Sequence, residues 1–168
     1  MFRNLTGDAL ENAIIQEISN HTKHGQKIHL KSFGITKLTK NMFKRFSNIL
    51  IIDLKENEIS EVEDETFSEN VKIEEIDFTC NRLTKVTKKM FYGEFKEMEE
   101  INLSKNLITS IEGSAFDKLT DLESVDLSFN GIRHLHSDLF KKNPNLMTVF
   151  LHENEITKID ADLFNPKV

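Results

Sequence analysis

The 168-residue sequence contains one cysteine, two prolines and six glycines. A single cysteine excludes a disulfide framework within the chain, and no apolar run reaches the roughly eighteen residues that a membrane-spanning helix needs. A glycine-rich phosphate loop is absent, as are the H-E-x-x-H and G-x-S-x-G motifs, so nucleotide, metalloprotease and serine-hydrolase chemistry have no signature here. We therefore expect a protein that is not an enzyme and holds no cofactor.

The balance of charge disfavours one class of partner. Acidic residues number 28 against 22 lysines and arginines, which gives a formal net charge of −6. A protein that binds nucleic-acid backbones in general needs a basic face. We expect the partner to be a protein or peptide, with no nucleic acid.

One apolar pattern occurs five times along the chain. Its form is L-x-x-L-x-L-x-x-N-x-L-x-x-L-x4-F, with other large apolar residues also in the leucine positions. The copies follow one another at a step of 24 residues, with one step of 25 near Tyr92. An irregular copy, with Phe33 in the asparagine position, precedes them. The asparagines of the five copies are Asn57, Asn81, Asn106, Asn130 and Asn154.

A period of about 20 to 29 residues with this spacing is typical of leucine-rich repeats. Over residues 25–165 the sequence resembles the leucine-rich repeat family, in the extracellular type of Toll-like receptors and secreted insect immune proteins. The resemblance implies an α/β solenoid with a parallel β-sheet on its concave face and an irregular or short-helical convex side. We expect a capping helix segment at 1–24 and a solenoid over 25–168, with repeats 25–48, 49–72, 73–97, 98–121, 122–145 and 146–168.

The spacing itself predicts how the repeats pack. The last two apolar positions of L-x-x-L-x-L lie two residues apart, on one face of a short strand. No single coil buries them, so the repeats are stable only as a stack. The chain then turns inward, where an asparagine amide can serve buried backbone donors and acceptors. We expect the five asparagines to form a structural ladder, and the pattern phenylalanines from Phe43 to Phe164 to stack under the convex side.

The two ends of the solenoid need separate explanations. Residues 6–18 predict an amphipathic helix with Leu10, Ile14 and Ile18 on one stripe and a capping box of Asp8 and Glu11. This helix is expected to cover the first coil, and docking of a partner is the alternative. The last coil is followed only by residues 165–168, which leaves a sheet edge open. The chain is a fragment, or the tail folds over this edge, or the edge forms a homodimer.

The exposed strand positions carry a strip of acidic residues. In the second to fourth regular copies, seven of nine such positions are acidic, and Asp53 extends the strip. Like charges on neighbouring strands cost stability, so we interpret the strip as a binding surface for a basic partner; a solvated face is the alternative. The residues concerned are Glu74, Glu75, Asp77, Glu99, Glu100, Asn102, Glu123, Ser124 and Asp126.

Exposed apolar residues are expected on both sides of the strip. Leu50 and Ile51 lie on one side, and Phe129, Met147 and Phe150 on the other. Aromatic residues beside charged ones are typical of interaction surfaces. We expect contacts to the partner at Asp53, Glu75, Asp77, Glu100, Asn102, Asp126, Phe129, Met147, Phe150 and His152.

Metal binding has weak support. The carboxylates lack the organised loop of a calcium site. The close histidine pairs, His21 with His24 and His134 with His136, lack cysteine or carboxylate partners at zinc-ligand spacing. We expect no metal.

The resemblance implies a secreted, extracellular protein of innate immunity. Related proteins usually have disulfide-linked caps, which this chain lacks, so a cytoplasmic scaffold or regulatory subunit is the alternative. Lone Cys80 is either a free thiol or an intermolecular disulfide partner. Asn4, Asn20 and Asn102 fit the glycosylation pattern. We expect no signal peptide at the start of this sequence, where residues 1–4 lead directly into a polar segment; a mature secreted protein that begins with a new methionine has the same appearance.

Overall fold

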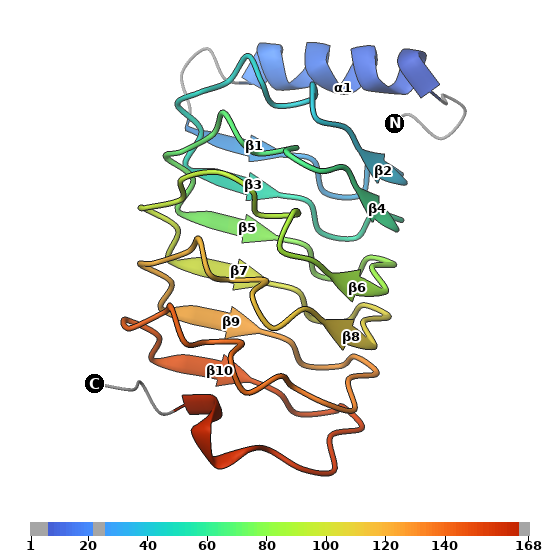
Figure 1. Cartoon of the computed structure of the whole chain (residues 1–168). Helices are drawn as coiled ribbons and strands as arrows, with labels where there is room; N and C mark the ends of the chain where they lie inside the picture. The colour runs from blue at the N-terminus through green and yellow to red at the C-terminus, as the bar shows by residue number, and fades with distance from the viewer. Residues whose placement is uncertain (1–6, 22–25, 165–168) are drawn as a thin grey trace.

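The computed structural model describes residues 7–21 and 26–164. Asn4, His24 and the tail 165–168 lie outside these ranges, and the side chains of Asp8, Leu10, Asn20 and His21 are not described either. The chain begins with one helix and then winds through successive short strands (Figure 1). The helix and the strands of the main sheet are α1 (Gly7–His21), β1 (Lys27–His29), β3 (Ile51–Asp53), β5 (Glu75–Asp77), β7 (Glu100–Asn102), β9 (Ser124–Asp126) and β10 (Thr148–Phe150).

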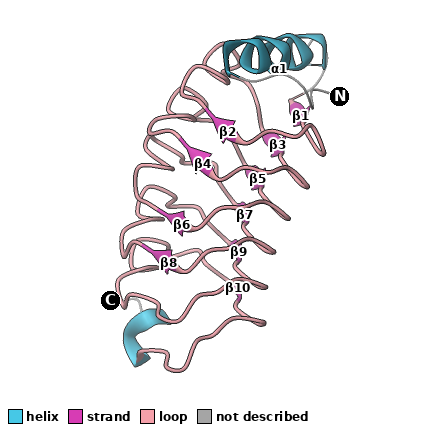
Figure 2. Cartoon of the chain, turned by 90° about the vertical axis from the view of Figure 1, so that its right-hand side faces the viewer, coloured by secondary structure: helices cyan, strands magenta, loops and turns pink. Residues whose placement is uncertain are grey.

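The main sheet has six parallel strands in the order β1-β3-β5-β7-β9-β10, one from each coil. The middle residues of the strands form a continuous apolar column that points into the core, because each strand pairs with the next in register. Figure 2 shows the stack curving with this sheet on its inner side. The predicted leucine-rich-repeat solenoid with a concave parallel sheet is confirmed. The column is Ile28, Ile52, Ile76, Ile101, Val125 and Val149.

Helix α1 closes the first end of the stack. Ile14 and Ile18, four residues apart on one helical face, are fully buried and belong to the same core as Ile28 and Leu30. The polar residues Asn12 and Gln16 are exposed. Such a helix covers the core of the first coil with one apolar stripe, so the predicted capping role is confirmed.

The convex side is made of turns and very short strands. The strands pair in two separate ladders, β2 (Lys37–Leu38) with β4 (Glu61–Val62) and β6 (Lys85–Val86) with β8 (Ser110–Ile111). The last element is the 3-10 helix η1 (Ala161–Phe164). The resemblance implied irregular or helical structure here, and the two-residue strands are an addition to it.

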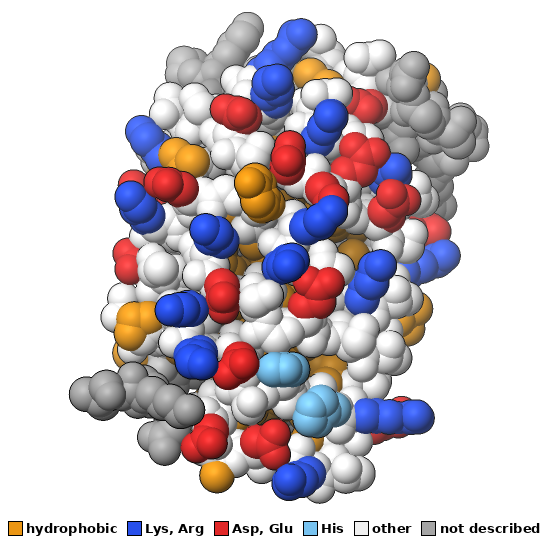
Figure 3. All heavy atoms as spheres, viewed as in Figure 1, with side chains coloured by type: hydrophobic (Ala, Val, Ile, Leu, Met, Phe, Trp, Pro, Cys, Tyr) orange, Lys and Arg blue, Asp and Glu red, His pale blue; other side chains and the backbone are white. Residues whose placement is uncertain are grey.

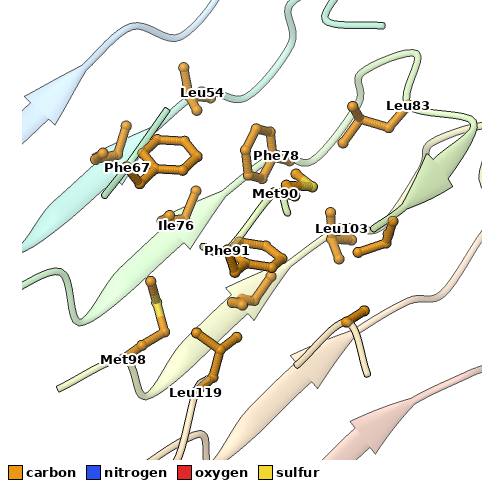
Figure 4. Close-up of a cluster of buried hydrophobic side chains, with 14 of the residues drawn as sticks. Leu54, Phe67, Ile76, Phe78, Leu83, Met90, Phe91, Met98, Leu103 and Leu119 are labelled. Atoms are coloured by element: carbon orange, nitrogen blue, oxygen red, sulfur yellow. The ribbon is translucent and has the colours of Figure 1, made fainter. Parts of the chain in front are cut away.

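The phenylalanine column stacks in two runs. Phe43 and Phe67 stack with ring centroids 5.4 Å apart, and the run from Phe91 through Phe116 and Phe140 to Phe164 has centroid distances of 6.1, 5.9 and 5.8 Å. Between the runs, Phe67 turns its edge towards Phe78 at 6.3 Å (Figure 4). Phe78 occupies a position where the other coils carry leucine. The phenylalanine column is therefore interrupted between Phe67 and Phe91. These residues belong to the two neighbouring coils whose convex strands, β4 and β6, do not pair.

The last coil is less covered than the others. Its pattern residues Leu146, Val149, Leu151 and Ile156 are only partly buried, and Ile159 is exposed. Among the described residues no further coil packs on them. The exposure of this coil agrees with the open sheet edge expected there.

Candidate functional site

The asparagines fix where each strand ends and which side chains it presents. Asn106 is buried and accepts a hydrogen bond from the Leu83 N–H (3.0 Å), while its amide donates to the carbonyls of Phe78 (3.0 Å) and Leu103 (3.1 Å). The other four asparagines repeat this arrangement. Each amide serves its own coil and the preceding one, so the first coil needs no asparagine. Phe33 can occupy that position because no coil precedes it.

A second column of side chains shapes the strand exits. Asp53, Asp77, Asn102 and Asp126 each accept a hydrogen bond from the backbone N–H two residues further on, at 3.2, 2.9, 3.0 and 2.8 Å. This is the turn that short polar side chains form with their own backbone. The residue three positions after each of these side chains, such as Phe129 with φ 54°, adopts the left-handed conformation. The sequence interpretation assigned these four residues to partner contact and missed their part in the turn.

Two of these aspartates share one lysine of the chain as their ion-pair partner. Lys55 lies 3.1 Å from Asp77 and 3.7 Å from Asp53, and the two aspartates are only 8% exposed. Burial lowers the pKa of Lys55, but its hydrogen bond to Asp77 and the negative charges around it outweigh this and raise the pKa overall. The expectation that Asp53 and Asp77 stand free on the surface is wrong, because the turn draws them in and Lys55 covers them.

The glutamates just before or at the start of β5, β7 and β9 have no lysine or arginine at ion-pair distance. Glu75 and Glu100 are adjacent in register on β5 and β7. Together with Glu74, Glu99 and Glu123 they surround a shallow depression of about 170 Å³. No described lysine or arginine lies within 4.0 Å of these five carboxylates or of Asp126. We call the five residues the glutamate cluster.

Glu100 records the electrostatic cost of this arrangement. Partial burial raises its pKa, and the charges of Glu75, Asp77 and Asp126 raise it further. Ionising this carboxylate therefore costs more free energy in the folded chain than in water. A cation brought by a partner would relieve this cost.

An apolar patch adjoins the glutamate cluster at the last two coils. Met147, Phe129 and Phe150 are 75%, 45% and 45% exposed. His152 lies between the two phenylalanines, perpendicular to each, with ring centroids 5.2 Å from Phe129 and 6.3 Å from Phe150. The structure thus brings Phe129, Phe150 and His152 together, while Met147 lies just before β10 and lines a hollow with Val149 and Phe164. We call these four exposed residues the C-terminal patch. By contrast, Leu50 and Ile51 are half-buried.

The opposite side of the molecule has a different charge pattern. In Figure 3 acidic and basic side chains alternate over the convex side. Several pairs bridge neighbouring coils there, including Lys89 with Asp64 at 2.7 Å and Lys37 with Glu61 at 2.9 Å. Concentration of one sign of charge without counter-ions is thus a property of the strand face.

The remaining candidates do not form sites of their own. Within residues 7–21 and 26–164, no group of histidine, cysteine and carboxylate side chains is arranged to hold a metal ion. In that part of the chain no helix has the length and apolarity to cross a membrane. Cys80 is a free thiol at a strand exit. Asn102 is half-buried on the strand face and accepts a 2.7 Å hydrogen bond from the Ser104 hydroxyl.

Fold and site together define a class: a repeat protein whose coils are joined by an asparagine ladder and present a concave sheet. The family model described as "Leucine rich repeat" matches residues 71–132 and 120–166, and the "BspA type Leucine rich repeat region" matches residues 12–96. The chain therefore belongs to the leucine-rich repeat family. No curated protein sequence matches it.

Several solved structures share the fold. The crystal structure of a TLR13–ssRNA13 complex has a TM-score of 0.74 at 22% identity, over 86% of this chain and 21% of that one. The glycosylated Toll–Spatzle complex of Drosophila has a TM-score of 0.70 at 21% identity, over 76% and 18%. A second Toll–Spatzle structure gives 0.61 at 22% identity, over 82% and 21%. The chain thus spans about a fifth of the length of these Toll-type chains, and the likeness establishes the fold.

Proposed function

We propose that this protein is a non-enzymatic binding module that holds a basic protein or peptide on its concave strand face. The observation that carries the proposal is the glutamate cluster, five carboxylates on neighbouring coils with no described lysine or arginine within 4.0 Å. Like charges side by side destabilise a sheet, and a cationic partner turns this cost into binding energy. The C-terminal patch beside the cluster supplies the apolar anchor that such surfaces usually contain.

The contact residues follow from this geometry. They comprise the glutamate cluster with Asn102 and Asp126, and the C-terminal patch of Phe129, Met147, Phe150 and His152. Asp53 and Asp77 take part through the turns and through Lys55, which they hold at the margin of the surface.

A charge-reversal experiment tests the proposal. Glu75→Lys/Glu100→Lys is compared with Glu69→Lys/Glu97→Lys, a control with the same change of net charge at exposed positions off the strand face. Both are tested by interferometry against arrayed nonapeptides of net charge +4 to −4. We expect the wild type and the control to bind the cationic peptides with equal affinity, and the strand-face variant to lose at least tenfold. Equal binding by all three proteins would refute the proposal.

A nucleic-acid arm belongs in the same experiment, because one Toll-type structure with this fold is a complex with ssRNA. We infer that the glutamate cluster repels a phosphate backbone, in line with the net charge of −6. A single-stranded RNA 13-mer should therefore not bind at 0.15 M salt. Saturable RNA binding would assign the face to a different class of ligand.

We further propose an extracellular location, as a secreted recognition or immune-modulating protein; a cytoplasmic scaffold is the alternative. Similarity to the Toll fold supports the first, and the free thiol of Cys80 fits the second equally well. Determining whether the native precursor carries a cleavable signal separates the two. Homodimerisation through the edge of β10 is a secondary proposal, and light scattering that detects only monomer at high concentration would remove it.

A further inference from the structure

We propose that the cationic anchor taken by the strand face is an arginine side chain, bound between Asp126 and Phe150. This inference rests on the proposed function and makes it more specific. Arginine and lysine satisfy a field of carboxylates equally by charge alone. They differ where carboxylates and aromatic rings lie side by side, and this chain has such a place.

Asp126 and Phe150 are partners in register on β9 and β10. Neighbouring strands are about 4.8 Å apart and side chains at paired positions share one face, so the carboxylate and the phenyl ring are adjacent. Asp126 is held in place by the 2.8 Å hydrogen bond from Ser128 N–H. The Met147 N–H donates to the Glu123 carbonyl at 2.9 Å, which fixes a second apolar residue beside a second carboxylate.

Phe150 stands in the position that holds aspartate or asparagine in the four preceding coils. Its ring lies perpendicular to that of His152 at 6.3 Å, and the residue is 45% exposed. The adjacent Phe129 ring already has the Lys105 ammonium 5.6 Å from its centroid. Over Phe150 no described lysine or arginine takes the equivalent place.

Guanidinium fits this arrangement better than ammonium does. It is planar and weakly hydrated, stacks on aromatic faces, and can bind a carboxylate through two parallel hydrogen bonds. Lysine offers a compact, strongly hydrated charge that gains less from the ring. An arginine stacked on Phe150 can direct its N–H groups at Asp126, while further basic residues of the same segment lie over Glu100 and Glu75.

The test uses three acetylated and amidated nonapeptides in which glycine alternates with arginine, lysine or uncharged citrulline. Affinities are measured by calorimetry at 0.15 M salt for the wild type, Phe150→Leu and a matched Phe164→Leu control. A cation over an exposed aromatic ring gains a factor of about two to five. We expect the arginine peptide to bind the wild type and the control that much more tightly than the lysine peptide, and citrulline to bind neither. In Phe150→Leu the arginine preference should fall to no more than half of its wild-type value, because only the hydrogen bonds to Asp126 remain, with lysine affinity unchanged within twofold.

Each other outcome decides against a stated claim. If the arginine and lysine peptides bind the wild type equally, and both lose affinity when Glu75 and Glu100 are reversed, the arginine anchor is wrong and the proposed function stands. An arginine preference that is undiminished in Phe150→Leu also overturns the assigned place. Absence of binding by both cationic peptides overturns the anchor and the proposed function together. Amide chemical shifts of Asp126 and residue 150 confirm that the variant is folded and report the site directly.

Discussion

Replacing Glu100 by a neutral residue should raise the stability of the protein and lower its affinity for cations. Glu75 and Glu100 are paired in register, and burial together with the neighbouring carboxylates raises the pKa of Glu100. Two unit charges about 5 Å apart repel by about 0.8 kcal/mol in water. Salt screening and solvent exposure reduce this, so Glu100→Gln should gain about 0.5 kcal/mol. For a chain of this size that raises Tm by about 1–2 °C.

The assay is urea unfolding followed by circular dichroism, with Glu97→Gln as the control, since Glu97 is exposed and has no described ion pair. The pH dependence has a definite sign. Because the folded pKa of Glu100 is raised, ionisation destabilises the fold above that pKa, and the cost disappears below the unfolded value of about 4.3. The gain from Glu100→Gln should therefore be present at pH 7, shrink in 0.5 M salt and vanish at pH 3. A variant no more stable than wild type at pH 7, or a gain that persists at pH 3, would show that repulsion is not the cause.

Substitutions at five further positions test the packing. Asn106→Ala should cost about 3 kcal/mol, since several buried backbone groups lose their partner, whereas Asn154→Ala in the less buried last coil should cost about 1; equal losses would contradict the ladder's dependence on burial. Phe116→Ala should cost about 3–5 kcal/mol in the same urea assay, because the ring is fully buried between two others. At Gly113 a Cβ would lie 2.6 Å from the His136 ring, so Gly113→Ala should destabilise by about 1 kcal/mol and His136→Ala should relieve part of that loss in the double variant.

The regular part of this fold could be predicted because each copy of the repeat checks the spacing that the other copies indicate. The recurrence of Asn57 at Asn81 and Asn106 fixes the coil length, and the coil length fixes which residues become neighbours. Strand positions, the capping helix and the core column follow from that spacing together with the two-residue alternation. The shift at Phe78 was not predictable, because it depends on how two aromatic rings share one layer.

The candidate site was predictable in outline only. Sequence spacing places Asp53 and Asp77 in the acidic strip, yet the structure draws them into turns beside Lys55. That difference arises from the path of the backbone at the strand exit, which a pattern of apolar residues does not specify. One signal was present: Asn102 stands in the same column without a charge, as expected where the side chain serves a turn.

The same column shows where charge is available to a partner. Four coils form the turn with a short polar side chain, and Asn102 does so uncharged, so the turn alone does not require aspartate. At Asp53 and Asp77 the charge is used internally by Lys55. At Asp126 no described basic residue uses it, and the next coil replaces the column with Phe150. Asp126 and Phe150, paired in register on adjacent strands, are therefore the place where the proposed function would account for this departure from the repeat.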